Sequence, residues 1–492
     1  MNYLNRKNSF RINEISKKEF CKYSLCPQDY KALVYKNQNF ITLNDLLISR
    51  YTGKEIGSDN YMKMSKYKFL KTVNITESFI LDRTSIEYCK PSLGNKPKSG
   101  SILIVKDGAG DGLGQVGLYL QDDKENKDYI SAGLIGIEVK EFFKYYILGI
   151  LKSQFFRDYI NINTAQGSTI RHSKLIALDF PVPFPTENNN YNPDKVLNLV
   201  SVLTQNIINK EQQIILNSQK INLLIENELN INTRVNLEYS FPNRVSLLNV
   251  RRLDTSLYTK RYLEENNKIE SYYRGYYQIP FSLFKSGSTP ETRIINGSKS
   301  ILKWVTPTNI SDEGFFNPID SISMPTGNNI KKDCILFINR TSKGKRGEFV
   351  GITCYYDTSY YGKGHHNQGI YRLEELAKEE MLFLTAFMNS NIMRKICGCF
   401  SNGSKMKEMK VSDFANLKFP NFDTSLKKKI GELYYKTVEK EKHTIESYLE
   451  KERLRNTRLG IFQLHQEIIE EKKRLNDIID KIIKEEPISI DF

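Results

Sequence analysis

Two short strings hold the residue types that could carry chemistry. The string ILIVKDGAGDGLG, residues 102–114, has a glycine-rich turn after an apolar run, as in turns that bind cofactors. The string GHHNQG, residues 364–369, places His365 beside His366, and paired imidazoles can bind a metal or contact a phosphate. Each interpretation needs a supporting neighbour: a helix directly after the glycines, or further ligands that converge on the histidines.

The glycine string lacks that neighbour. QVGLYLQ follows Gly114 and has the pattern of a strand, so we predict that the glycines close a β-hairpin. A methyltransferase acting on nucleic-acid amino groups with S-adenosylmethionine would also need an Asn/Asp-Pro-Pro-aromatic loop, which this sequence does not contain. We therefore predict no cofactor-binding residue in this chain.

The histidine pair is equally isolated. The two halves of the chain are similar, as described below, and the stretch of the first half that matches GHHNQG is DYISAG at residues 128–133. It has no histidine, which excludes a duplicated metal site. Glu-x-Lys strings of the nuclease type begin at Glu125 and Glu138, but a chain rich in Glu and Lys produces such strings freely. We predict no metal-binding and no catalytic residue, and we keep the imidazoles as candidate contacts to phosphates or bases.

The chain is an internal duplication. Landmarks of the first half recur in the second, in the same order, at offsets of 233 to 236 residues. The pairs are Asn74 and Asn309, Leu103 and Leu336, Val116 and Val350, Gly133 and Gly369, and Gly167 and Gly403. A unit of this length is too long for a solenoid, whose periods run to about 50 residues. We therefore expect two similar domains that present two similar surfaces.

Both copies keep small, polar and basic residues at equivalent loops. AQGSTIRHSK at residues 165–174 matches SNGSKMKEMK at residues 401–410, and the second copy of the central hairpin gains basic residues. Hydroxyls and amides position phosphates, and Arg, Lys, Asn and Gln read base edges in the major groove. The predicted DNA-binding residues are Lys106, Ser168, Thr169, Arg171, His172, Lys174, Arg340, Lys343, Lys345, Arg346, His365, His366, Ser404, Lys405, Lys407 and Lys410.

Composition agrees with an anionic partner without identifying it. The chain has 72 Lys and Arg against 57 Asp and Glu, a net charge of +15, which suits a phosphate backbone or an anionic membrane. The most apolar run, YYILGIL, is far shorter than the ~20 residues that span a bilayer. No signal peptide is visible at the start, and seven scattered cysteines form no CxxC pair. We expect a cytoplasmic protein.

The polar stretches after each copy have helical periodicity. Apolar residues at heptad spacing predict a helix from Asp194 to about Leu229, interrupted by polar Lys210 and Asn217, and Gly460 predicts a break in the C-terminal stretch. Two such arms could pair antiparallel, each burying what the other exposes. The predicted contact residues are Val200, Leu203, Ile207, Ile214, Ile221 and Leu224 in the first arm, and Leu426, Ile430, Leu433, Leu475, Ile479 and Ile482 in the second.

The predicted fold is α+β. It comprises two tandem globular domains, each followed by a long helix, with the helices pairing as an antiparallel coiled coil. Proline-rich FPVPFP ends the first domain, because prolines continue neither a helix nor a central strand. The predicted order is an N-terminal extension at 1–39, a first domain at 40–190, a helical arm at 191–235, a second domain at 251–422 and a C-terminal helical arm at 423–486.

At these residues the chain resembles the specificity subunit of type I restriction-modification systems. FKSGSTP (284–290) resembles the start of a recognition domain in that family, ILIVKDGAGDGLGQVG (102–117) its central hairpin, and GSTIRHSKLIALDFPVPFP (167–185) its exit into the helix. The second exit, GSKMKEMKVSDFANLKFP (403–420), is more divergent. The resemblance covers roughly residues 40–485, and the order of its motifs, given twice, is what makes it specific.

The resemblance implies a non-catalytic DNA-recognition subunit with a role in antiviral defence and DNA methylation. Each domain would read one half of a bipartite, asymmetric target in double-stranded DNA. The arms would set the spacer and bind two methyltransferase subunits, and restriction subunits could join. S-adenosylmethionine, ATP and Mg would belong to those partners. Two alternatives stay open: an adenine-specific DNA methyltransferase or nuclease with its own active site, and a coiled-coil scaffold or inhibitor that mimics such a subunit without binding DNA.

Overall fold

The chain forms two compact units in the computed structural model. Unit 1 comprises Met1–Gln212, Glu439–Thr457 and Gln466–Phe492, and unit 2 comprises Gln213–Val438 and Arg458–His465. The division therefore runs through the long helix between the two halves of the sequence, and we describe each unit by itself. The structure describes residues 36–83, 86–91, 95–121, 127–164, 168–189, 192–231, 254–289, 301–317, 319, 321–323, 329–342 and 349–490.

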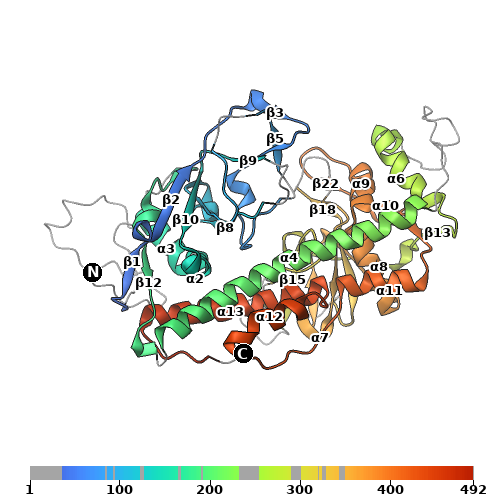
Figure 1. The fold of residues 1–492 in the computed structure, drawn as a ribbon. Helices are drawn as coiled ribbons and strands as arrows, with labels where there is room; N and C mark the ends of the chain where they lie inside the picture. Colours follow the sequence, from blue (N-terminus) through green and yellow to red (C-terminus); the bar gives the residue numbers. More distant parts are fainter. Residues whose placement is uncertain are drawn as a thin grey trace. The chain divides into compact units, whose positions relative to one another are not determined.

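A four-stranded antiparallel sheet with the order β2-β10-β6-β8 forms the centre of unit 1 (Figure 1). Its strands are β2 (Leu47–Thr52), β6 (Ile102–Val105), β8 (Val116–Leu118) and β10 (Leu134–Val139). The central strand β6 is buried along its whole length, because each of its four residues is apolar and both of its neighbours are strands. The helices α2 (Glu141–Lys152) and α3 (Gln154–Asn163) follow β10, and α2 packs against β8.

Smaller ladders surround this sheet. An outer sheet has the order β3-β5-β4-β9, in which β4 and β9 are parallel. Two further pairs, β1 with β12 and β7 with β11, are antiparallel. The bounds are β1 (Phe40–Thr42), β3 (Tyr61–Met62), β4 (Tyr67–Leu70), β5 (Glu87–Cys89), β7 (Asp107–Gly108), β9 (Lys127–Ile130), β11 (Arg171–His172) and β12 (Pro181–Pro183).

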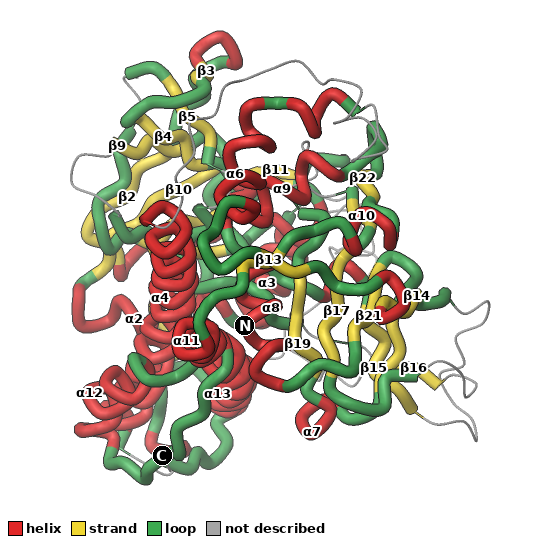
Figure 2. Tube along the Cα trace, turned by 90° about the vertical axis from the view of Figure 1, so that its right-hand side faces the viewer, coloured by secondary structure: helices red, strands yellow, loops and turns green. Residues whose placement is uncertain are grey.

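Unit 2 repeats the central sheet and the two small ladders of unit 1, which confirms the duplication. Its central sheet has the order β14-β21-β17-β19, equivalent to β2-β10-β6-β8 (Figure 2). In its outer sheet, β15 is parallel to β20 and antiparallel to β16, and the pairs β13 with β23 and β18 with β22 match the small ladders of unit 1. The strands are β13 (Tyr276–Tyr277), β14 (Phe284–Ser286), β15 (Ile301–Val305), β16 (Ser321–Ser323), β17 (Cys334–Ile338), β18 (Arg340–Thr341), β19 (Thr353–Tyr356), β20 (Gly364–His366), β21 (Ile370–Leu373), β22 (Lys407–Glu408) and β23 (Phe419–Pro420).

The helices of unit 2 follow the same plan. α8 and α9 correspond to α2 and α3, and in both units a serine, Ser153 or Ser390, directly precedes the second helix. The apolar stretch that follows β10 is therefore two helices, divided at Ser153. The bounds are α6 (Lys260–Glu270), α7 (Thr358–Tyr361), α8 (Lys378–Met388), α9 (Asn391–Phe400) and α10 (Val411–Ala415).

The predicted first arm is the helix α4 (Pro193–Ile231), whose 39 residues extend about 58 Å at 1.5 Å per residue. The second arm is three helices: α11 (Thr424–Tyr434), α12 (Ile445–Asn456) and α13 (Ile461–Lys484). The predicted break near Gly460 lies between α12 and α13. A glycine is needed there, because a Cβ atom at this position would lie 2.5 Å from the backbone nitrogen of Lys436. No helix among the described residues is long and apolar enough to cross a lipid bilayer.

Most of the apolar stripe predicted for the arms is buried. The buried members are Val200, Leu203, Ile207, Ile214, Ile221, Ile430, Leu475, Ile479 and Ile482. Leu224, Leu426 and Leu433 are half-buried. In unit 1, α2 packs on α4 through Gly149, where a side chain would collide with Thr204, 2.6 Å away. The heptad spacing of α4 therefore serves contacts with its own domain as well as with other helices.

Candidate nucleic-acid interface

The predicted basic loop of unit 1 is tied to the central hairpin by a two-residue ladder. β11 pairs with β7 so that His172 lies opposite Asp107 and Arg171 opposite Gly108. The His172 Nδ1 and Asp107 Oδ1 atoms are 2.8 Å apart, and Lys106 Nζ lies 3.3 Å from the other Asp107 oxygen. Arg171 donates hydrogen bonds to the Gly110 carbonyl oxygen and to Asn161 Oδ1, at 2.9 and 3.0 Å. The fold thus brings together basic residues that are far apart in the sequence.

The outer part of this loop faces solvent. The side chain of His172 is 62% exposed, and Ser168, Thr169 and Lys174 are exposed as well. Lys174 has φ of +48°, a left-handed conformation that is uncommon for a residue with a Cβ atom. The second ring nitrogen of His172 and the Lys174 ammonium are therefore available to an anionic partner.

The glycine string joins the antiparallel strands β6 and β8, as predicted, and its last glycine also serves packing. Gly114 has φ of +75°, and a Cβ atom there would lie 3.2 Å from the Ile160 side chain on α3. Its counterpart Gly351 has φ of +84°, with the Cys397 sulfur of α9 at 2.6 Å from the same position. Both copies therefore have a glycine at this place, where a side chain would collide with the second helix.

Unit 2 builds the same loop pair from different side chains. β18 pairs with β22, so that Arg340 lies opposite Glu408 and Thr341 opposite Lys407. Met409 donates its backbone N–H to the Asn339 carbonyl oxygen at 2.8 Å, as Ser173 does to Lys106 at the same distance. The predicted residues Ser404, Lys405 and Lys410 are exposed, and Lys407 and Arg340 are half-buried. Lys343, Lys345 and Arg346 lie outside the described residues.

The two adjacent histidines lie in β20, apart from the basic ladder. His365 is 4% exposed, and its ring stacks on Trp304, its register partner in β15, with 5.5 Å between ring centroids. His366 is fully buried and its Nδ1 lies 3.1 Å from the Ile370 carbonyl oxygen. Burial, with Arg372 and His365 nearby, lowers the pKa of His366 to about 3. DNA contact by these rings stays a prediction, and their burial disfavours it.

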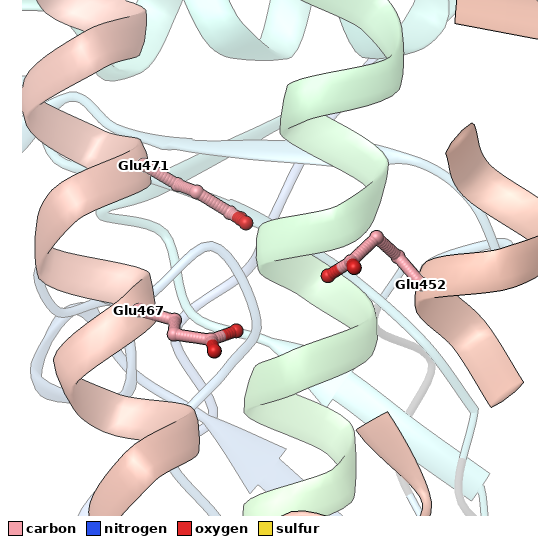
Figure 3. A group of neighbouring side chains, drawn as sticks. All are labelled: Glu452, Glu467 and Glu471. Carbon is pink, nitrogen blue, oxygen red and sulfur yellow. The ribbon is translucent and has the colours of Figure 1, made fainter. Parts of the chain in front are cut away.

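Sequence reasoning missed a buried charge cluster in the helical arm of unit 1. Lys210 of α4 is fully buried, and its Nζ lies 3.2 Å from Glu452, 3.1 Å from Glu467 and 2.5 Å from Glu471. Figure 3 shows the three carboxylates, which point toward one another. Glu452 comes from α12 and the other two carboxylates from α13. Arg455 also contacts Glu452 and Glu467. The ammonium group lies where three carboxylates could otherwise have held a metal ion.

The cluster keeps Lys210 charged. Burial alone lowers the pKa of Lys210, but the carboxylates of Glu471, Glu467 and Glu452 outweigh it and raise the pKa above its ordinary value. Lys210 and Arg455 face three carboxylates, and burial raises the pKa of Glu471.

The signal for this cluster in the sequence was Lys210 itself, a polar residue at a heptad position. Asn217, the second interruption, is also buried and donates to the Leu459 carbonyl oxygen within unit 2 at 2.9 Å.

No protein-family model and no curated protein matches this sequence. Among solved structures, the chain is similar to the type I restriction-modification system S subunit from M. genitalium, at 14% identity and a TM-score of 0.40, over 92% of this chain and 98% of that one. It is similar to the HsdS subunit from Thermoanaerobacter tengcongensis at 11% identity and a TM-score of 0.27, over 92% and 98%.

A chain from a structure of the type I R-M system matches at 11% identity and a TM-score of 0.28, over 91% of this chain and 99% of that one. The M. genitalium and Thermoanaerobacter chains are S subunits of the family that the sequence resembles. These similarities concern the fold alone, and the functional assignment below is built on the loops and helices of this chain.

Proposed function

We propose that this chain is a non-catalytic DNA-specificity subunit that reads a bipartite, asymmetric target. The observation that carries the proposal is the duplicated loop ladder with opposite chemistry in its two copies. In unit 1 the hairpin contributes Asp107 and the loop His172, whereas in unit 2 the hairpin contributes Arg340 and the loop Glu408. Two ladders of one geometry that carry different donors and acceptors are suited to two different half-sites.

The exposed residues beside each ladder would provide the phosphate contacts. Ser168, Thr169 and Lys174 in unit 1, and Ser404 and Lys405 in unit 2, are hydroxyl and basic side chains on the solvent side. Such contacts fix the position of a protein on the duplex, and the ladder residues could then read base edges. The net charge of +15 favours association with a polyanion.

We propose that the arms form an antiparallel coiled coil that sets the spacer and binds two methyltransferase subunits. On α4, Asn206 contacts Glu471 and Lys210 contacts Glu467, so residue numbers rise along one helix as they fall along the other. A rigid support of this kind could hold two readers at a fixed separation. S-adenosylmethionine would be carried by the methyltransferase subunits. ATP and Mg would be carried by restriction subunits, if the complex contains them. We propose that the complex acts in the cytoplasm.

The test is to map methylated adenines in DNA treated with the complex of this chain and its methyltransferase subunits. We expect one asymmetric motif with two specified halves and an unspecified spacer. Replacing residues 40–190 by those of a relative should change one half only. A change in both halves would contradict independent reading by each unit.

A control separates recognition from catalysis by this chain. The isolated chain should bind no S-adenosylmethionine in equilibrium dialysis and should methylate no DNA, because the proposal places the cofactor on partners. If the complex retained no genomic fragment in a gel shift at low salt, the chain would be a scaffold and the recognition proposal would fail.

A further inference from the structure

Both units present an equivalent loop to their helices. The loop follows a short turn in which Asn74, or its counterpart Asn309, accepts a backbone N–H bond from Lys71 or Thr306. In unit 1 the loop is residues 75–82. It leaves the outer strand β4 and contacts the helices of its own unit, as the following bonds show.

In unit 1, Glu211 of α4 holds this loop. Its Oε2 atom accepts the backbone N–H groups of Phe79 and Ile80 at 2.8 and 3.2 Å, while its Oε1 lies 2.9 Å from Lys472 of α13. Glu211 is 7% exposed and Phe79 2% exposed. Both carboxylate oxygens are therefore engaged, one by the recognition domain and one by the arm.

Lysines close the contact from both sides. Lys472 donates to the Glu77 carbonyl oxygen at 3.1 Å, and Lys152 of α2 donates to the Thr76 carbonyl oxygen at 2.8 Å. Both ammonium groups lie over the Phe79 ring, 5.4 and 5.6 Å from its centre. The loop is held both through its backbone and through the buried Phe79 ring.

In unit 2 a tyrosine takes the corresponding place. Tyr434 of α11 donates its hydroxyl hydrogen to the Gly314 carbonyl oxygen at 2.6 Å, and its oxygen accepts the Tyr355 backbone N–H at 3.1 Å. The His465 ring of α13 stacks on Phe315, with 3.7 Å between centroids. Both copies thus use helix side chains to hold the backbone of the same loop, through the carboxylate of Glu211 in the first and the hydroxyl of Tyr434 in the second.

We propose that Glu211 is the positioning residue of the first recognition domain: its carboxylate, shared between the loop backbone and Lys472, fixes the domain on the helical arm. The proposal rests on the proposed function, since it concerns where a DNA-reading domain is held. Glu211 touches no DNA. It acts by setting the orientation of the domain against the arm, and so the separation at which the first half-site is read relative to the second.

The physical basis is the charge of the acceptor. A carboxylate accepting backbone N–H groups makes stronger bonds than a neutral amide oxygen, by a factor of roughly two in energy. Glu211→Gln keeps the shape of the side chain and removes the charge that attracts Lys472 and the two N–H groups. The pair with Lys472, whose side chain is 29% exposed, is also open to screening by salt.

The first experiment measures hydrogen–deuterium exchange of the full chain, comparing the wild type with Glu211→Gln and Tyr434→Phe. We expect the Phe79 and Ile80 amide groups to exchange about tenfold faster or more in Glu211→Gln. Their exchange in the wild type should rise about twofold or more between ~0.05 and ~0.5 M NaCl, and this salt response should shrink in the variant. Tyr434→Phe should loosen residues 311–316 and leave 76–80 unchanged.

The second experiment uses the complex with methyltransferase subunits on DNA whose spacer is lengthened or shortened by one base pair. We expect Glu211→Gln to keep both half-site sequences and to accept an altered spacer that the wild type rejects. Unchanged exchange at Phe79 and Ile80 would overturn the proposed hold on the loop. Faster exchange with an unchanged spacer preference would overturn the positioning role. Failure of the wild-type complex to bind DNA would instead refute the proposed function, and the exchange result would still decide whether Glu211 holds the loop.

Discussion

Replacing Lys210 by methionine should be among the most destabilising single changes in the helical arm. Methionine fills most of the space of the lysine stem but removes the ammonium group that lies within 3.2 Å of three carboxylates. Arg455 would then be the cation that remains in contact with Glu452 and Glu467. Three carboxylates whose oxygens lie within 4.8 Å of one another would share it.

The expected cost is about 4 kcal/mol, because removing one partner of a buried ion pair typically costs about 3–5 kcal/mol. Burial already raises the pKa of Glu471. A carboxyl group with a raised pKa in the folded state stabilises that state below its ordinary pKa, and the contribution is lost as pH rises through the raised value. Without Lys210 this effect should grow, so the variant should recover stability on going from about pH 8 to about pH 5.

Hydrogen–deuterium exchange of the α12 and α13 amide groups measures the free energy of opening in unit 1. A loss of about 4 kcal/mol corresponds to exchange roughly a thousandfold faster. Lys220→Met is the matched control: Lys220 lies on the same helix and is exposed, so its replacement should change stability by less than about 0.5 kcal/mol. Adding Glu471→Gln to Lys210→Met should restore part of the stability, because it removes a surplus negative charge.

Equal stability of Lys210→Met and Lys220→Met at both pH values would refute this reasoning. So would a Lys210→Met variant that is least stable in acid, since protonation of the carboxyl groups should relieve their repulsion. A loss of stability without any pH dependence would indicate a packing defect at Lys210 in place of an uncompensated charge.

Three further outcomes are expected at other sites. Replacing exposed Lys405 and Lys410 together by alanine should weaken DNA binding by the complex. In a salt titration, the slope of log affinity against log salt should become less negative by about 0.9 for each phosphate that is no longer neutralised. Burial and Lys472 lower the pKa of Lys152 from 10.5 to about 7. Between those pH values only the unfolded chain keeps the proton, so the stability of the wild type should rise with pH. Lys152→Met should remove this pH dependence, as measured by urea titrations at several pH values. Gly460→Ala should cost about 1–3 kcal/mol in thermal unfolding, because its Cβ atom would lie 2.5 Å from the Lys436 backbone nitrogen.

Local patterns in the sequence were enough to predict the elements that depend on local spacing. The heptads predicted α4 to within two residues at each end, and Gly460 predicted the break before α13. The duplication was visible because backbone requirements recur: the glycine at Gly114 and Gly351 is needed in both copies for the same close approach. Such requirements survive divergence, since no other residue satisfies them.

What the sequence could not predict depends on contacts between distant segments. The partners of Lys210 lie more than 240 residues away, on two different helices. The ladder between Asp107 and His172 is two residues long on each side, too short to leave a periodic signal. His365 lies opposite Trp304 in the neighbouring strand and is buried there. The strand register that causes this burial cannot be predicted from the sequence alone.

The interleaving of the two units has a consequence for synthesis. Lys210 and Glu211 leave the ribosome early, but Glu452, Glu467 and Lys472, with which they pair in unit 1, follow only after residues 213–438 of unit 2. At about 5–20 residues per second, that delay is roughly 10–50 seconds. During it, a lysine and a glutamate destined for burial must stay solvated, and residues 213–438 of unit 2 are synthesised before unit 1 is complete. Nascent chains stalled before residue 445 should therefore lack α12 and α13, and with them the partners of Lys210 and Glu211.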